Sequence, residues 1–395
     1  MAGIAAALFG IGEVRRPAGP LRHVFRAYAA AVTLVVVYVH FFTYVQPWTL
    51  AALFLSGIYV LIFPLVCAGR HSNPARPSAL DFVLCAISLA IFVYFGVSAN
   101  RIVNRVPVVD ELTTIDMIVG VVYVILSIEV TRRTTGLGLA LIVLFFLAYI
   151  FLGHHLGGVI GSGRVTLEAF LDSIVYGIYG LHGEITRVAA SYALLFVMFG
   201  ALLTESGGGQ FFYNMAAALT GRSAGGPAKI AVISSGLYGT ISGNAVSDVV
   251  TTGSVTIPMM KRVGYAPQYA AAVEATASLG GSLTPPVMGA AAFVMAEYTG
   301  ISYADIAFAA LGPSMLFYFA VFSQVHFRAK RDGMAALQDG EVPRFGASMR
   351  EGGLFLVPLV VLIAALALGY TAPFAAIVGT IAVVIVAALR ARTRL

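Results

Sequence analysis

Long apolar stretches separated by short polar loops dominate the pattern of positions along the chain. An α-helix needs about 20 mostly apolar residues to cross the hydrocarbon core of a bilayer. Two segments, 227–258 and 266–299, are also apolar but are interrupted by small residues and prolines. Uninterrupted stretches near the spanning length run at about 25–45, 48–67, 80–99, 116–131, 136–156, 188–204, 304–326, 353–371 and 373–389. The pattern therefore predicts an all-α integral membrane protein.

The composition indicates that lipid is the solvent for most of the chain. Hydrophobic residues make up 59% and charged residues 11% of the 395 residues, against roughly 25% charged in an ordinary soluble domain. A chain this poor in charge cannot cover itself with a hydrated surface, which excludes soluble enzymes, nucleic-acid-binding proteins and disordered scaffolds. The net charge of +6 does not indicate nucleic acid, because the basic residues lie between apolar spans.

No residues form a catalytic or structural-metal pattern. The two cysteines, Cys67 and Cys85, lie in or beside apolar runs and give neither a disulfide framework nor a thiolate metal site. His154 and His155 are adjacent, so they cannot share one helix face as metal ligands. We therefore expect neither an enzyme nor a protein with a bound cofactor.

The basic residues predict which side of the membrane each loop faces, since cytoplasmic loops are enriched in Lys and Arg. We place the N-terminus in the cytoplasm, count 266–299 as a crossing, and let 227–258 enter and leave on one side. Ten crossings then return the C-terminus to the cytoplasm, with 20 of the 24 basic residues inside. A straight crossing by 227–258 would divide the downstream basic residues between the two sides. We expect about ten transmembrane helices and one re-entrant helical hairpin in a bacterial or archaeal cytoplasmic (inner) membrane.

Charged residues near the ends of the spans have simpler expected roles. Segment 167–180 has apolar residues on one face and Glu168 and Asp172 on the other. It is either a helix lying in the outer membrane interface or an ordinary amphipathic connector. Glu129, near the cytoplasmic end of its span, is expected to pair with the neighbouring Arg132 and Arg133.

Segment 227–258 has the pattern of two short helices joined by a tight turn. Its centre, residues 242–244 (Ser-Gly-Asn), suits a turn because Gly accepts positive φ and Asn tolerates it. The arms, about 228–241 and 246–259, are each too short to span. Irregular backbone is tolerated at membrane depth only where protein buries it or a cavity hydrates it. The turn is therefore a candidate binding site.

The turn offers groups for both anions and cations. The second arm begins there, so its free N–H groups and positive dipole end attract an anionic group. Asn244, Ser247 and Asp248 add side-chain oxygens, and the carbonyls that end the first arm can bind a cation. The alternative is that the small residues here only allow close helix packing. Asp248 argues against this alternative, because an ionisable group at a membrane helix centre costs at least ~2.5 kcal/mol.

A second break is predicted inside 266–299. Gly280-Gly281 and Pro285-Pro286 interrupt the apolar run. Proline removes a backbone donor and clashes with the preceding turn, which frees carbonyls near 281–283. Secondary transporters use such unwound carbonyls at mid-depth to coordinate a coupling ion. The alternative is a proline kink that binds no ligand.

Glu274, two turns before this break, has two possible roles. It could carry a proton, or it could be a carboxylate near the cytoplasmic boundary beside Lys261 and Arg262. The second interpretation is the favoured one.

The sequence around the two breaks resembles a known family. The run GGPAKIAVISSGLYGTISGNAVSDVVTTGSVTIPMMKRVGYAPQYAAAVEATASLGGSLTPPVMGAAAFVMAEYTGISY is similar to the large permease subunit of tripartite ATP-independent periplasmic (TRAP) transporters. The strings VVTTGS and PPVMGAAAFVMAE look most like the branch that uses TAXI-type receptors, in which small and large membrane subunits are often fused. The resemblance covers about 185–335 continuously, and the four spans before residue 135 fit the place of the small subunit.

The resemblance implies three regions. A small-subunit-like four-helix membrane region covers 1–135, a linking span and interfacial helix cover 136–187, and the first half of the large permease subunit covers 188–395. The last region holds the re-entrant hairpin 227–258 and the broken helix 266–299. In the family an inverted second half carries its own hairpin, and no such string follows here. We expect half of an inverted-repeat, elevator-type transporter, completed by a second chain or truncated. The remaining interpretation is a partner-docking membrane subunit without transport activity of its own.

The resemblance also implies a function. A periplasmic solute-binding protein of the TAXI type would deliver an organic anion such as a carboxylate, and a gradient of sodium or protons would drive it inward. Many relatives have a serine pair where this chain has Asn244-Ala245, which leaves the coupling ion open. The implied sodium ligands are Ser242, Asn244, Gly281 and Leu283. The implied ion- and substrate-binding residues are Ser242, Gly243, Asn244, Ser247, Asp248, Thr251, Thr252, Gly280, Gly281, Ser282, Thr284 and Pro285.

Overall fold

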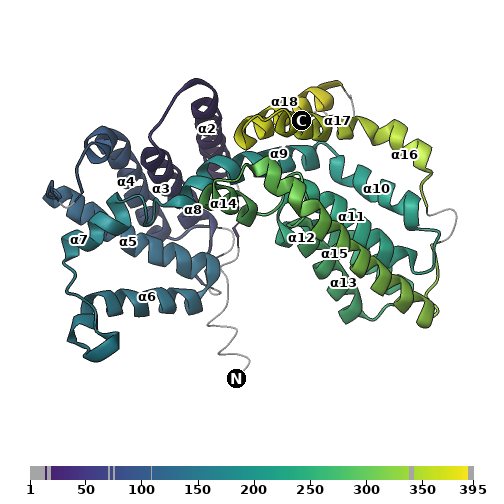
Figure 1. Ribbon diagram of the computed structural model, residues 1–395, viewed down its shortest axis with the longest axis horizontal. Coiled ribbons are helices and arrows are strands. Elements are labelled where there is room, and N and C mark those ends of the chain that lie inside the picture. The colour runs from purple at the N-terminus through teal and green to yellow at the C-terminus, as the bar shows by residue number, and fades with distance from the viewer. Residues whose placement is uncertain are drawn as a thin grey trace. The chain divides into compact units, whose positions relative to one another are not determined.

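The computed structural model of the chain is almost entirely helical (Figure 1). It describes residues 14–15, 19–69, 72–73, 76–107, 109–337 and 342–389. Within these ranges no strand occurs, and Val14 and Val66 form an isolated bridge. Nine helices of the described residues are long and apolar enough to cross a membrane, which confirms the predicted all-α membrane fold. The chain forms two compact units, residues 1–190 and 191–395, each described by itself.

The apolar runs are helices close to their predicted bounds. Most helix ends lie within five residues of the predicted ones. The main difference is at 353–371, whose helix begins at Phe345, because the polar helix α16 (Phe345–Gly352) continues into the span through a 3-10 turn. The short helix α10 (Gly208–Thr220) was not predicted. Hydrophobic length therefore predicted the spans well and the polar helices between them poorly.

The described residues of unit 1 form five long helices followed by short ones. Its core is aromatic, with the rings of Trp48, Phe95, Tyr123 and His182 stacked or edge to face. The elements are α2 (Pro20–Phe42), α3 (Pro47–Leu65), α4 (Ala79–Val103), α5 (Thr114–Thr135), α6 (Leu137–Leu152), η1 (Gly153–His155), η2 (Gly158–Ile160), α7 (Leu167–Leu171), the π-helix η3 (Asp172–Tyr176) and α8 (Glu184–Val188).

Buried charges join α4 to α5 in unit 1. The Asp81 carboxylate, in the first turn of α4, lies 2.7 Å from the Arg133 guanidinium and 2.8 Å from that of Arg15. Both Asp81 and Arg133 are buried. The Glu129 carboxylate lies 2.8 Å from Arg132 and 2.7 Å from Arg133, which confirms its predicted pairing. A buried carboxylate with two guanidinium partners has its charge compensated.

Segment 167–180 packs against the loop between α4 and α5, and its position in the membrane interface stays a prediction. It is helical over 167–176, and Asp172 is buried in an ion pair with Arg105. Oε1 of Glu168 accepts a hydrogen bond from the N–H of Leu112 at 2.9 Å. Both carboxylates therefore contact the loop between α4 and α5.

Unit 2 carries the predicted hairpin and broken helix. Helices α11, α12 and α13 pack against one another, and α15 packs against α11 and α13. The π-helix η4 (Ala189–Ala193) leads into the unit. Besides α10 and α16, its elements are α9 (Leu194–Glu205), α11 (Gly226–Ser242), α12 (Ala245–Arg262), α13 (Pro267–Gly281), α14 (Ala290–Thr299), α15 (Tyr303–Arg331), η5 (Gly353–Phe355), α17 (Leu356–Ala367) and α18 (Ala372–Leu389).

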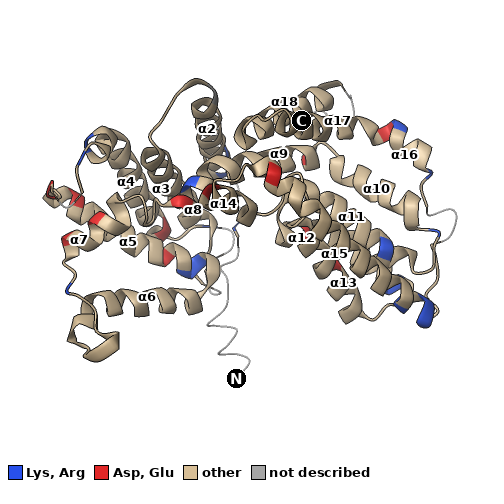
Figure 2. Ribbon diagram, in the orientation of Figure 1, with Lys and Arg blue, Asp and Glu red and all other residues tan. Residues whose placement is uncertain are grey.

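Helices α11 and α12 form a hairpin whose open end lies beside the end of α15. Gly225, before α11, donates its N–H to the carbonyl of Met334 at 3.3 Å. The Arg328 guanidinium lies 5.3 Å from the centre of the Tyr269 ring, near the start of α13. Lysine and arginine residues of these helices gather at the same end (Figure 2). The chain thus enters and leaves the hairpin at one end of unit 2, and the side of the membrane that this end faces stays a prediction.

Candidate ion and substrate site

The turn between α11 and α12 has the conformation predicted for it. Gly243 ends α11 with a φ of 60°, a left-handed value that favours glycine. Asn244 caps α12, since its Oδ1 accepts hydrogen bonds from the N–H groups of Val246 at 3.1 Å and Ser247 at 3.2 Å. The Asn244 oxygen therefore faces its own helix and fixes where α12 begins.

The broken helix packs against the tip of this hairpin. Helix α13 ends at Gly281, the chain is irregular over 282–289, and α14 follows. The N–H of Val287 donates to the carbonyl of Thr240 at 3.2 Å. The carbonyl of Met288 approaches Gly243 so closely that a Cβ there would be 1.9 Å from it. The predicted hairpin and the predicted break are thus in direct contact.

Asp248 is the buried acidic group at this contact. Its side chain is fully buried in the first turn of α12, and its Oδ1 accepts a hydrogen bond from the Ser242 hydroxyl. Its Oδ2 has no hydrogen-bond partner among the described residues and lies beside Gly239 and Gly281. A buried carboxylate without a counter-charge is costly. The position therefore suits the uptake of a proton or a cation.

The structure brings part of the predicted set together. Ser242, Gly243, Asp248 and Gly281 meet where the hairpin tip touches the break. Ser282 continues from Gly281 into the irregular segment, and its carbonyl accepts the N–H of Gly289 at 2.7 Å. Ser242, Asp248 and Gly281 belong to α11, α12 and α13, so the contact joins three helices.

Other predicted residues of the hairpin and the break are exposed or half-buried. Ser247 and Thr251 are exposed on one face of α12, where the Thr251 hydroxyl donates to the Ser247 carbonyl at 2.9 Å. The Leu283 side chain is exposed and Pro285 is half-buried. Asn244 fits the predicted sodium site less well than Ser242, because its Oδ1 already accepts two hydrogen bonds. The binding roles of all these residues stay predictions.

Thr252 belongs to a second buried cluster, which is centred on Glu274. The favoured interpretation of Glu274, as a boundary carboxylate beside Lys261 and Arg262, is wrong. The Glu274 side chain is fully buried, and hydroxyl groups are its hydrogen-bond partners. These hydroxyls come from α11, α12 and α13 and belong to Ser235, Thr252, Thr256 and Ser278. Apart from Thr252, none of the four was among the predicted site residues.

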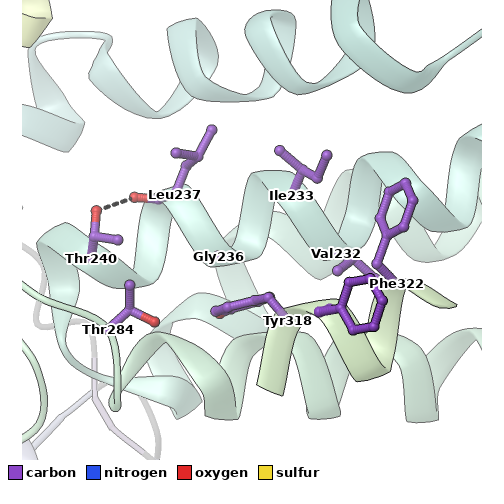
Figure 3. Close-up of a pocket in the computed structure, with 9 residues that line it drawn as sticks. Val232, Ile233, Gly236, Leu237, Thr240, Thr284, Tyr318 and Phe322 are labelled. Atoms are coloured by element: carbon purple, nitrogen blue, oxygen red, sulfur yellow. Dashed lines mark hydrogen bonds between the residues drawn. The ribbon is translucent and has the colours of Figure 1, made fainter. Parts of the chain in front are cut away.

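A pocket of about 370 Å³ lies between α11 and α15 (Figure 3). The Thr240 and Thr284 side chains lie at the end nearer the hairpin tip, and Phe322 lies at the other end. The Thr240 hydroxyl donates to the Leu237 carbonyl at 2.7 Å, and the Thr284 and Ser314 hydroxyls share a hydrogen bond of 2.7 Å. The remaining lining is largely apolar, so the pocket suits hydrocarbon better than a carboxylate.

Unit 2 therefore combines a helical hairpin, a broken helix in contact with its tip, and a buried carboxyl group at the contact. Discontinuous helices of this kind are typical of membrane proteins of the secondary-transporter class. The chain belongs to one family of that class, described as tripartite ATP-independent periplasmic transporter, DctM component, which matches residues 122–395. The match begins within α5, so it covers more of the chain than the resemblance at 185–335. The TAXI-type branch and the fusion with a small subunit stay predictions.

Individual relatives match about half of the chain. The C4-dicarboxylate TRAP transporter large permease protein DctM of Rhodobacter capsulatus is 29% identical over 45% of this chain and 43% of its own length. The sialic acid TRAP transporter large permease protein SiaM of Vibrio cholerae is 25% identical over 45% and 41%. The 2,3-diketo-L-gulonate TRAP transporter large permease protein YiaN of Escherichia coli is 23% identical over 54% and 52%. The chain spans about half the length of the curated relatives it matches.

Proposed function

We propose that the chain is the hairpin-bearing part of a TRAP permease and takes part in ion-driven secondary uptake of an organic carboxylate. The observation that carries this proposal is Asp248, a buried carboxyl group with one unpartnered oxygen where the hairpin tip meets the broken helix. Membership of the DctM family supports the transporter class. The substrates named for the three relatives all contain a carboxylate group, which supports an organic anion as the substrate class.

In this proposal Asp248 binds the positive charge of the coupling ion, sodium or proton. The Ser242 hydroxyl donates to Oδ1, and Gly239 and Gly281 pack beside Oδ2 without offering it a side-chain partner, so Oδ2 stays buried and unpartnered. A positive charge at Oδ2 neutralises the carboxylate, so the loaded site can be buried at lower cost than the empty one. The site therefore favours movement through the membrane with its ion bound.

The exposed face of α12 is the surface that we assign to the substrate. Ser247 and Thr251 present hydroxyl groups there, and the positive dipole end of α12 lies at the same tip. We also propose that a periplasmic solute-binding protein, of the TAXI type, delivers the substrate. The N- and C-termini would face the cytoplasm.

The test is accumulation of a carboxylate by the complete permease in proteoliposomes, with radiolabelled succinate and sialic acid as probes. Asp248→Asn keeps the size of the side chain and removes its charge, and Asp248→Ala removes both. We expect each variant to insert normally and to lose accumulation against a gradient. Glu297→Gln, at an exposed position on α14, is the matched control and should keep the wild-type rate.

Two outcomes would contradict the proposal. Wild-type accumulation in Asp248→Ala would remove Asp248 from the mechanism. A folded wild-type complex that accumulates neither probe under a sodium or a proton gradient would favour the partner-docking membrane subunit.

A further inference from the structure

Glu274 lies at the centre of a buried hydroxyl cluster that the proposed site does not use. The Ser235 hydroxyl donates to Oε1 at 2.7 Å, and the Thr252 hydroxyl contacts the same oxygen. The Thr256 hydroxyl donates to Oε2, and the Ser278 hydroxyl lies 3.3 Å from Oε1. The carboxyl group is therefore held from three helices and is fully buried.

No basic side chain pairs with this carboxyl group in the part of the chain that the structure describes. The ionisable groups that interact electrostatically with it are Asp248 from α12 and Tyr318 from α15. The basic residues of the neighbouring helices have other partners. Lys229 of α11 is hydrogen-bonded to the loop that precedes that helix, and the Arg328 guanidinium of α15 lies over the Tyr269 ring of α13. Two buried carboxyl groups, those of Glu274 and Asp248, thus interact electrostatically, and neither has a basic partner among the described residues. Such a pair holds at least one proton or cation, because two buried negative charges repel.

The chemistry of the surrounding shell favours exchange of a proton. A guanidinium or a backbone N–H can only donate, so a shell of such groups stabilises the ionised carboxylate alone. A hydroxyl can donate or accept and rotates to suit its partner. The four hydroxyls around Glu274 can all donate to a carboxylate, and one of them can turn to accept from a protonated acid. The same shell therefore satisfies the group in both states.

The spacing of the oxygens favours a proton over a metal cation. A hard cation binds oxygen ligands at about 2.4 Å, which places neighbouring ligands of an octahedron about 3.4 Å apart. Here the Ser235 hydroxyl lies 2.7 Å from Oε1 and 2.9 Å from the Thr252 hydroxyl. The oxygens are in direct hydrogen-bond contact and leave no space for a cation between them.

We propose that Glu274 and its four hydroxyl partners form a proton-binding site that loads and unloads during transport. A proton from water adds to the carboxylate to give the neutral acid, and it returns to water when the cluster opens. The Thr252 hydroxyl also lies 2.7 Å from the Asp248 carbonyl oxygen, to which it can donate in place of Oε1, so the cluster is joined to the hairpin tip. This assignment makes the proton a coupling ion, and that part rests on the proposed uptake function.

Infrared spectroscopy of the full chain in lipid nanodiscs tests the site without any transport. A protonated carboxylic acid has its own carbonyl-stretch band, which shifts in heavy water. We expect a band in the wild type that grows as pH falls, is lost in Glu274→Gln and is kept in Glu297→Gln. Thr256→Val, which removes the donor to Oε2, should shift that band. Identical carboxylic acid bands in wild type and Glu274→Gln at every pH would overturn the proposal.

Accumulation assays on the complete permease test the coupling. Under a pH gradient alone we expect the wild type to concentrate succinate, and Glu274→Gln only to equilibrate it. Accumulation that needs sodium and is unchanged in Glu274→Gln would overturn proton coupling while leaving the uptake function intact. If the wild type transports nothing, the uptake function fails, and the infrared band still decides whether Glu274 binds a proton.

Discussion

Gly239 of α11 and Gly281 of α13 face each other backbone to backbone where the hairpin crosses the broken helix. A Cβ on Gly239 would lie 2.3 Å from the Gly281 Cα, and a Cβ on Gly281 would lie 2.5 Å from the Gly239 Cα. Rotation of a side chain cannot relieve either contact, because the opposing atom belongs to the backbone. The unpartnered oxygen of Asp248 lies beside both glycines, so this close approach also shapes the proposed ion site.

Gly281→Ala should therefore destabilise unit 2. The added methyl group forces α11 and α13 apart, and overpacking of this kind typically costs about 1–3 kcal/mol. Thermal unfolding of the purified chain in detergent should show a lower melting temperature than the wild type. The control is Gly312→Ala on α15, where nothing lies within 4 Å of the new Cβ. Equal melting temperatures for the two variants would show that the helices can separate without cost.

Replacement of Asn244 tests its role as the cap of α12. Asn244→Ala removes the acceptor for the first N–H groups of α12 and should cost about 1 kcal/mol of stability. Asn244→Asp keeps that acceptor, so its melting temperature should match the wild type. Melting curves of the two variants give the comparison. Wild-type stability in Asn244→Ala would mean that other contacts define the start of α12.

The hairpin and the break could be predicted because their signals are local. Gly243 adopts the positive φ expected of a turn, and Asn244 begins the second arm. Helix α13 stops at Gly281, four residues before the first of the two prolines. Each of these effects depends on the preferences of one or two residues, so the linear sequence is sufficient to show them.

The surroundings of Glu274 could not be predicted because they depend on which helix faces meet. Thr252 and Thr256 are spaced i, i+4 on α12, and Glu274 and Ser278 have the same spacing on α13, so each pair lies on one helix face. Nothing in the sequence indicates that these two faces pack together, or that Ser235 of α11 joins them. The linear sequence therefore places this carboxylate beside the nearest basic residues, although its hydrogen-bond partners come largely from neighbouring helices.

Asp81→Ala should be the most damaging single change in unit 1. It removes the shared partner of two buried guanidinium groups, those of Arg15 and Arg133. Loss of one member of a buried ion pair typically costs roughly 3–5 kcal/mol. We expect a large fall in melting temperature and a lower yield of folded chain. Asp332→Ala, which breaks an exposed pair with Arg328, should leave the melting temperature unchanged. Similar effects of both changes would show that burial does not strengthen the Asp81 interaction.

His182 is a neutral imidazole in the aromatic core of unit 1. Its ring is fully buried, stacks on Tyr123 and meets Trp48 and Phe95 edge to face. Nδ1 lies 2.6 Å from the carbonyl of Val175, which can only accept, so Nδ1 carries the hydrogen. Nε2 then accepts from the Tyr123 hydroxyl at 3.2 Å. Burial lowers the pKa of His182 to about 4.

The stability of unit 1 should therefore fall as the pH drops below about 6.5, the pKa of an unperturbed histidine. Between that value and about 4, the unfolded chain binds a proton at His182 and the folded chain does not. This difference lowers the free energy of unfolding by about 2 kcal/mol from pH 7 to pH 5. The matched variant is His182→Gln, which can keep both hydrogen bonds and does not titrate. Melting temperatures of both proteins at pH 7 and pH 5 should show a smaller decrease for the variant, and equal decreases would contradict a buried neutral His182.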